Sequence, residues 1–188
     1  MIRHPSSRSH RGGLLNLGAR DSLADGFARR LDDDWHWFRR VTAGGTEPID
    51  AVVVGPGGTW TLTSAGERGR FARRNGHWYR WNRSTESWVP WDPRPITEAR
   101  LAARRLALYL ERAGLPGDVR AVLVPPADMS LESLPADPIG ILVEREVDRI
   151  APFVTAAPVL SQQQVDRIVA LLDPRQPLPQ LAPSTHGG

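Results

Sequence analysis

The chain has 188 residues and a formal net charge of +3, and this length suits one domain with tails. No apolar run approaches the roughly 20 residues of a membrane helix, and the N-terminus lacks the apolar segment of a signal peptide, so we predict a soluble, cytoplasmic protein without a membrane partner. The absence of cysteine and lysine excludes disulfides, thiolate metal sites, cysteine nucleophiles and any mechanism that needs a lysine amine. All 24 basic residues are arginines, and with so small a net charge a basic binding surface must come from their clustering.

The two ends of the chain differ in composition from its middle. Residues 1–20 hold four arginines and two histidines among serine, glycine and proline, which predicts a basic flexible arm. Residues 174–188 are rich in proline and predict a disordered tail. One folded domain is therefore expected over residues 21–173.

The domain is predicted to begin with a short helix and a strand. In residues 22–31 the large apolar side chains of Leu23, Phe27 and Leu31 recur every four residues, which predicts a helix that three aspartates then end. Residues 35–41 are aromatic and alternating, and this pattern is typical of a strand.

The next segment predicts a hairpin. Residues 49–54 are nearly all apolar, as in a strand that is buried on both faces. The run Gly-Pro-Gly-Gly at 55–58 turns the chain, and residues 59–64 alternate between threonine and large apolar side chains. We expect these two strands to pair directly.

A four-residue loop in this hairpin places Val54 opposite Thr59 and, counting back, Asp50 opposite Thr63. Directly opposed residues on one face have Cβ atoms about 4.5–5.5 Å apart. A metal-dependent nuclease needs two carboxylates that converge on Mg²⁺ and a nearby lysine. Here one carboxylate is present, and the facing positions hold Thr63 and Ala65. Asp50 is therefore a vestigial metal ligand or a buried carboxylate held by hydrogen bonds.

Residues 66–83 hold six arginines against one glutamate, with aromatic residues interleaved. Short strands at 69–74, 76–81 and 87–91, with the hairpin signal Asn-Gly at 75–76, predict a small ribbon. Arginines pair with phosphates while aromatic rings stack on bases, so the ribbon is either a nucleic-acid surface or a solvated ribbon with inward aromatics. The candidate nucleic-acid-binding residues are Arg68, Arg70, Arg73, Arg74, Arg80, Trp78, Tyr79 and Trp81.

The second half of the domain is predicted to be mainly helical. Residues 96–113 form the longest helix, with apolar residues on two sides, and residues 119–124 form a strand. A polar loop is expected to about residue 138, then a strand at 140–143 and a helix at 144–153.

The last helix has the clearest local signals. Ser161 and Gln164 form a capping box at its start, and Leu160 can contact Val165 as a hydrophobic staple. Pro174 is expected to end this helix.

At this point the sequence resembles the nuclease-related domain (NERD) family, a branch of the restriction-endonuclease-like superfamily. The resemblance covers roughly residues 22–172 and implies an α/β three-layer domain with a central mixed β-sheet flanked by helices. The matching features are Gly26, Ile49-Asp50, the run VVVGPGG, Gly66 or Gly69, Trp78, Pro95 and the helix at 96–113.

The departures from the family pattern are systematic. The family Glu-x-Lys pair falls on Thr63 and Ala65, the glutamate of its first helix falls on Phe27, and the glutamine of its long helix falls on Glu98. Only Asp50 is kept of the catalytic set that the resemblance implies. A lone carboxylate is a poor site for Mg²⁺, which prefers oxygen ligands of higher charge.

These observations lead to a predicted function with two alternatives. We predict a degenerate, catalytically inactive domain without metal or cofactor that binds DNA, RNA or another protein. The first alternative is a weak Mg²⁺-dependent DNA nuclease in which Glu67 joins Asp50, if the strand after Thr63 continues regularly, with Arg68 or Arg70 in place of the lysine. The second alternative is a protein-interaction module with no nucleic-acid role.

Overall fold

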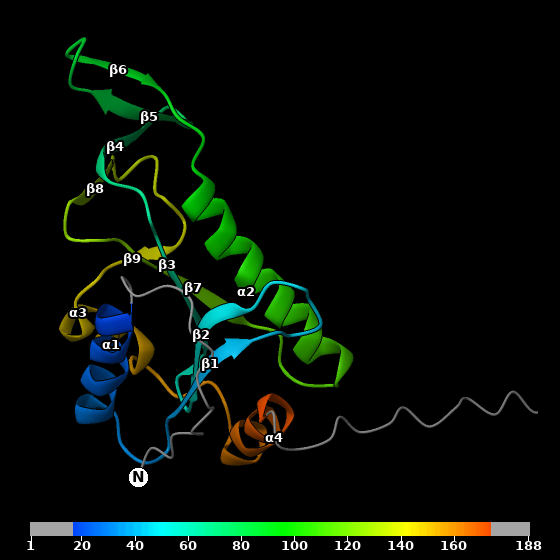
Figure 1. Ribbon diagram of the computed structural model, residues 1–188. Coiled ribbons are helices and arrows are strands. Elements are labelled where there is room, and N and C mark those ends of the chain that lie inside the picture. Colours follow the sequence, from blue (N-terminus) through cyan, green and yellow to red (C-terminus); the bar gives the residue numbers. More distant parts are fainter. Residues whose placement is uncertain (1–16, 174–188) are drawn as a thin grey trace, which may run out of the picture.

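The computed structural model describes residues 17–173, with side chains from residue 23 onward, and these residues form two mixed sheets and four helices (Figure 1). In chain order the elements are α1 (Leu17–Arg30), β1 (His36–Val41), β2 (Ile49–Gly55), β3 (Gly58–Ser64), β4 (Gly69–Arg74), β5 (His77–Asn82), β6 (Ser87–Pro90), α2 (Arg94–Arg112), β7 (Val119–Val124), β8 (Met129–Ser133), β9 (Leu142–Val143), α3 (Val147–Val154) and α4 (Gln162–Leu172).

The large sheet has the strand order β1-β2-β3-β7-β9. Strands β1 to β3 are antiparallel, whereas β7 is parallel to both β3 and β9, so the sheet is mixed. Val54 pairs with Thr59, which confirms the predicted hairpin register. Gly55 also pairs with Gly58, so the turn itself is the two residues Pro56 and Gly57, shorter than the predicted loop.

Helices cover both faces of the large sheet (Figure 1). Successive side chains of a strand point to opposite faces, and β2 is apolar throughout, so it contributes to two cores. The core beneath α2 and α4 contains Val52, Val54, Leu106, Leu110, Val165 and Ile168. The core beneath α1 and α3 contains Phe27, Ala51, Val53, Val122, Ile150 and Val154. The structure is therefore mixed α/β, and the large sheet with its helices is compatible with the predicted three-layer architecture.

A second, smaller sheet has the strand order β6-β5-β4-β8. Two of its strands continue the chain directly from β3 and β7 of the large sheet. Strand β4 follows β3 in the chain, and β8 follows β7. In the large sheet β3 pairs with β7, in the small sheet β4 pairs with β8, and both pairings are parallel. Between the sheets, the Ala65 N–H donates to the Val124 carbonyl and the Gly69 N–H to the Asp128 carbonyl, each at 3.0 Å. The N-terminal half of α2 covers this junction, with Ile96 packed among buried side chains of both sheets.

Strand β8 corrects the prediction of a polar loop as far as residue 138. Met129 is buried and Leu131 half-buried, and the partner that supplies the backbone hydrogen bonds of β8 is β4. The alternation of apolar and polar residues at 129–133 is compatible with a strand. The strand was not predicted because its partner, β4, lies about 60 residues earlier in the chain, as the pairing of Gly69 with Met129 shows.

Several predicted element boundaries also differ. Helix α1 begins at Leu17, so the last residues of the predicted arm belong to a helix, and residues 1–16 and 174–188 lie outside the described part. Helix α3 begins at Val147, because the Glu144 carboxylate accepts the backbone N–H groups of Arg145 and Glu146 just before it. In the part of the chain that the structure describes, no helix is both long and apolar enough to cross a membrane.

The glycine-rich hairpin turn has a packing role. A Cβ atom on Gly57 would lie 2.0 Å from the Val154 carbonyl oxygen, and one on Gly55 would lie 2.3 Å from the Trp35 ring. The Pro56 carbonyl accepts the N–H groups of Val159 at 2.7 Å and Leu160 at 3.0 Å. The turn is therefore fixed against the end of α3 and the segment that leads to α4.

Candidate functional site

The start of β2 and the end of β3 bring Asp50 close to Ser64. The half-buried Asp50 carboxylate accepts the Ser64 backbone N–H at 2.9 Å. Thr63 is half-buried, and Ala65 is 8% exposed within the core at the junction of the two sheets. The position where a lysine would be expected is thus part of an apolar wall, and Asp50 takes part in holding the hairpin.

Glu67 does not continue the face of Thr63 and Ala65 as the nuclease alternative requires. Strand β3 ends at Ser64, and residues 65–68 belong to no strand. The Glu67 carboxylate instead accepts the indole N–H of Trp91 at 2.8 Å. Within residues 17–173, no group of three or more histidine, aspartate and glutamate side chains is arranged to hold a metal ion.

Of the other departures from the predicted family pattern, the one at Phe27 has a structural explanation. Phe27 is 1% exposed and packs on Trp37 with ring centroids 5.6 Å apart, in the core between α1 and the large sheet. Glu98 is exposed on α2. A carboxylate at position 27 would therefore be buried among apolar side chains, at a high desolvation cost.

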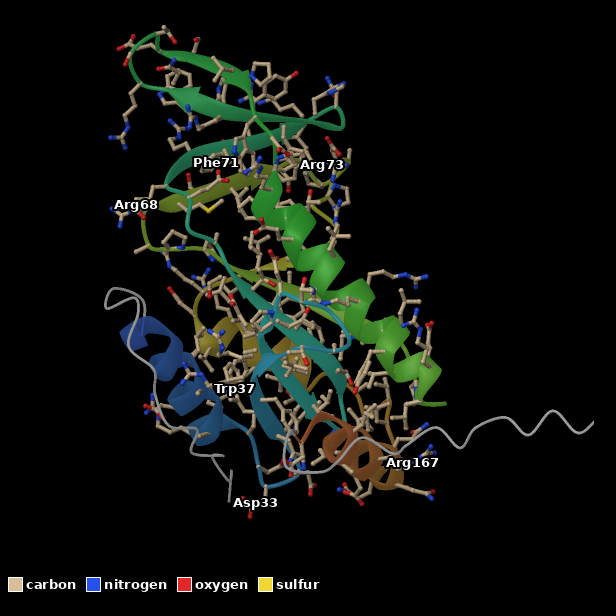
Figure 2. All side chains as sticks on the ribbon, turned by 45° about the vertical axis from the view of Figure 1, so that its right-hand side comes forward. Asp33, Trp37, Arg68, Phe71, Arg73 and Arg167 are labelled. Atoms are coloured by element: carbon tan, nitrogen blue, oxygen red, sulfur yellow. The ribbon has the colours of Figure 1, made fainter. Side chains whose placement is uncertain are left out.

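The arginine-aromatic ribbon has two different faces. The register places Phe71, Arg73, Trp78 and Arg80 on one face of β4 and β5, because paired residues share a face and alternate along each strand. This face meets the core: Phe71 is buried, and Trp78 packs against Trp91 at 5.7 Å. Figure 2 shows Phe71 and Arg73 close to the start of α2, whereas Arg68 projects away from it.

The Arg73 side chain makes contacts within the protein, to Asp137 and Pro138. Its Nε lies 2.7 Å from an Asp137 carboxylate oxygen, and Nη1 donates to the Pro138 carbonyl at 2.8 Å. Only 21% of the Arg73 side chain and 15% of the Asp137 side chain are exposed. The same Asp137 carboxylate accepts the Gly76 N–H at 2.7 Å. The ion pair therefore fixes the loop after β8 to the β4–β5 turn.

The opposite face of the small sheet carries the remaining candidates. We call it the Arg–Trp face, and it consists of Arg70, Arg74, Tyr79, Trp81 and Trp88. The Arg70 guanidinium carbon lies 5.8 Å from the centroids of both Trp81 and Trp88, and that of Arg74 lies 4.9 Å from Trp88. The two indoles meet edge to face at 5.4 Å. Half-buried rings and exposed guanidinium groups thus alternate on one surface.

The charges of this face are weakly compensated. Arg70 has one acidic partner, Glu132 at 3.3 Å, and both side chains are about half exposed, so water screens the pair. Among residues 17–173, Arg74 has no acidic partner. Arg68 pairs with Asp128 at 3.3 Å at the junction of the sheets, and Arg80 lies exposed on the other face.

A groove of about 1140 Å³ lies at the β9 edge of the large sheet, and we call it the edge groove. It is bounded by α2, β7, β8, the segment 138–146 and α3, and Asp50 does not line it. Five arginines and three acidic residues line it, namely Arg100, Arg104, Arg120, Arg145, Arg149, Asp118, Glu144 and Glu146.

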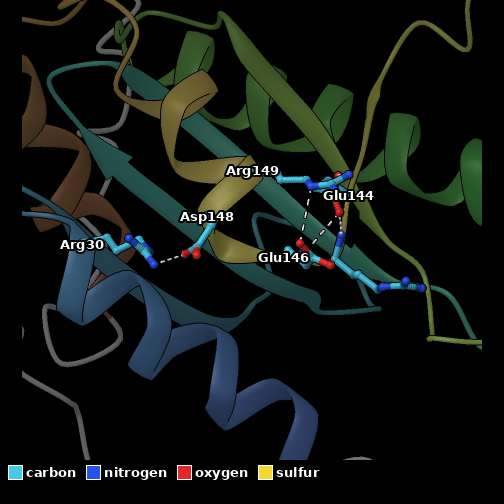
Figure 3. A network of polar contacts seen from close by, with 6 residues as sticks. Arg30, Glu144, Glu146, Asp148 and Arg149 are labelled. Atoms are coloured by element: carbon cyan, nitrogen blue, oxygen red, sulfur yellow. Dashed lines mark hydrogen bonds and ion pairs between the residues drawn. The ribbon is translucent and has the colours of Figure 1, made fainter.

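One wall of the edge groove is a polar network around the start of α3 (Figure 3). Arg149 pairs with Glu144 at 3.6 Å and with Glu146 at 3.4 Å. Burial alone would raise the pKa of Glu144, but the backbone N–H groups of Arg145 and Glu146 and the Arg149 guanidinium together hold this pKa below its usual value. Asp148 pairs with Arg30 and so ties α3 to α1.

No protein-family model, curated protein or solved structure matches this chain. The nuclease-related family therefore stays a prediction from the sequence.

Two parts of these surfaces were missed by the sequence reasoning. Trp88 belongs to a correctly predicted strand, but its place beside Trp81 depends on the pairing of β5 with β6. The arginines of the edge groove are spread over residues 100–149, so no local run marks them. Only the tertiary structure brings them together.

Proposed function

We propose that this domain is a catalytically inactive member of the nuclease-related family, with a restriction-endonuclease-like fold, that binds single-stranded nucleic acid through the Arg–Trp face. The order α1-β1-β2-β3-α2-β7, with β7 parallel to β3, supports the fold because it matches the order of elements on which the resemblance rests.

The arrangement of the Arg–Trp face carries the binding proposal. Arg70 lies within 6 Å of the Trp81 and Trp88 rings and Arg74 within 6 Å of the Trp88 ring. No helix of residues 17–173 covers this face of the small sheet (Figure 1). Guanidinium groups bind phosphates, and every base has a flat surface that stacks on an indole, so such a face accepts unpaired nucleotides of any sequence. A duplex hides its bases in the stack and offers only its backbone to such a surface.

The geometry at Asp50 supports the absence of catalysis. The Asp50 carboxylate holds the Ser64 N–H, and the Glu67 carboxylate holds the Trp91 indole. Hydrolysis assisted by a cation needs both carboxylates to turn toward a shared ion. Each would have to give up a hydrogen bond that fixes the junction between the two sheets.

Binding of a labelled oligothymidylate, followed by fluorescence anisotropy over a range of salt concentrations, tests the proposal. We expect log K to fall linearly with log salt. The double variant Arg70→Gln with Arg74→Gln should weaken binding and reduce the slope by about 1.4, which corresponds to two lost phosphate contacts at about 0.7 each.

The matched control is Arg112→Gln with Arg167→Gln, which removes the same charge from exposed positions on α2 and α4. This control should keep the wild-type slope. Equal losses in the two double variants would show a non-specific charge effect and would contradict a defined site.

The nuclease alternative is tested separately, with plasmid and single-stranded DNA in the presence of Mg²⁺ or Mn²⁺. We expect no cleavage above the background of an Asp50→Ala variant. Cleavage by the wild-type chain that Asp50→Ala abolishes would overturn the proposed inactivity, while leaving the binding result to stand on its own.

A further inference from the structure

One edge of the large sheet is open within the edge groove. Strand β7 pairs with β3 along its whole length but with β9 only at Val122 and Leu123. The Leu123 carbonyl accepts the Glu144 N–H on the β9 side. Backbone groups alternate in direction along a strand, so Ala121 and Val119 also face the β9 side. The Val119 N–H already donates to the Gly117 carbonyl at 3.0 Å. The Val119 carbonyl and the Ala121 N–H are therefore the groups left at this edge, and both residues line the groove.

The charge of the groove is positive after its internal pairs are counted. Asp118 pairs with Arg120 at 3.9 Å, and Glu144 and Glu146 pair with Arg149. The other lining arginines, Arg100, Arg104 and Arg145, have no acidic partner among residues 17–173. Arg100 and Arg145 instead donate to the backbone carbonyls of Ile139 and Ala127, which holds their side chains at the walls.

The groove also offers an apolar contact on its α3 side. Phe153 lines it and is 54% exposed, so its ring can be contacted from within the groove. On the same side of the sheet, the Arg120 guanidinium stacks on Trp60 at 5.2 Å, so that wall is already ordered. An open strand edge, three uncompensated arginines and one exposed aromatic ring thus lie in a single cavity.

We propose that the edge groove binds an extended acidic peptide segment of a partner protein, which adds as a short strand beside residues 119–121 of β7. Its carboxylates pair with Arg100, Arg104 and Arg145, and an apolar side chain contacts Phe153. The open backbone edge favours a peptide over a nucleic acid, because a peptide presents the alternating N–H and C=O groups that match it. This site is separate from the Arg–Trp face and does not depend on it.

Fluorescence anisotropy with a labelled ten-residue peptide of alternating glutamate and valine tests this inference on the full chain. We expect saturable binding that weakens about tenfold in Arg100→Gln with Arg104→Gln, as two part-exposed ion pairs predict. The variant Arg112→Gln with Arg167→Gln should bind like the wild type, and so should Arg70→Gln with Arg74→Gln. Circular dichroism verifies that each variant is folded.

Two further probes separate strand addition from simple charge attraction. The same peptide with N-methylated valines keeps its charge but loses alternate N–H donors, so we expect it to bind at least about tenfold more weakly. A peptide of alternating glutamine and valine should also bind weakly. Equal binding of the N-methylated peptide, no saturable binding of the glutamate peptide, or stronger binding of an oligothymidylate at Arg100 and Arg104 would each overturn the inference.

Discussion

At the scale of single residues, the direction of each side chain decides the role of neighbouring arginines in the ribbon. Arg73 and Arg74 are adjacent in the sequence but lie on opposite faces of β4. Arg73 holds Asp137, whereas Arg74 lies over Trp88 in solvent. The alternation of side chains along a strand predicts that Arg73 and Arg74 lie on opposite faces. Only the position of α2 and of the loop at 134–138 shows which of these faces is covered.

We therefore expect Arg73→Gln to destabilise the protein by about 1–3 kcal/mol, because it leaves the largely buried Asp137 carboxylate without its charged partner. Urea unfolding measures this loss. The affinity of the folded variant for oligothymidylate should stay within about twofold of the wild type. A change of this size is no more than the loss of one exposed ion pair would cause. A large loss of affinity with unchanged stability would assign Arg73 to the binding surface instead.

The stability of the folded protein should depend on pH because of His36. Burial in β1 lowers the pKa of His36 below its usual value of 6.5, although Asp166 and Asp34 act in the opposite direction. The unfolded chain then binds more protons than the folded chain below about pH 6.5, so the free energy of unfolding should fall as the pH drops through that range.

The variant His36→Gln should reduce this loss of stability between about pH 7.5 and 5.5, as measured by urea midpoints, because the residue no longer titrates. Identical profiles for the wild type and His36→Gln would contradict the assignment.

At the scale of elements, the β2–β3 turn shows that a sequence feature on which a family resemblance was predicted has a packing cause. The run IDAVVVGPGG is the most specific part of the predicted resemblance, and two of its glycines lie where a Cβ atom would overlap Val154 or Trp35. These glycines are needed because the β2–β3 turn lies directly against α3.

We expect Gly57→Ala to destabilise the protein by about 1–3 kcal/mol or more, since the overlapping atom is a backbone oxygen that cannot move alone. The matched control is Gly66→Ala, where nothing lies within 4 Å of the added Cβ. That change should leave stability within about 1 kcal/mol of the wild type. Equal urea midpoints for both variants would show that α3 can move away from the turn at little cost in stability.

At the scale of the whole molecule, local patterns predicted most elements but not their assembly into two sheets. Apolar strands, the Asn-Gly turn and the capping box of α4 were readable because each depends on a few neighbouring residues. Strand β8 was missed because its partner is distant in the chain. The edge groove was missed for the same reason, since α2, β7 and α3 meet there only after folding.

The two proposed surfaces occupy different parts of the molecule. The Arg–Trp face belongs to the small sheet, and the edge groove lies at the side of the large sheet. The long helix α2 spans both, with Ile96 at the junction and Leu110 in the core of the large sheet. The two proposed ligands would therefore not compete for the same surface.

The most direct test of the central claim is a titration of the ¹⁵N-labelled protein with oligothymidylate, followed through the tryptophan indole N–H signals. Each signal is assigned from a single Trp→Phe variant. The account predicts that the signals of Trp81 and Trp88 shift, while those of the buried Trp35 and Trp60 keep their positions. Unchanged signals of Trp81 and Trp88 at saturation, or shifts centred on Trp60 beside the edge groove, would contradict it.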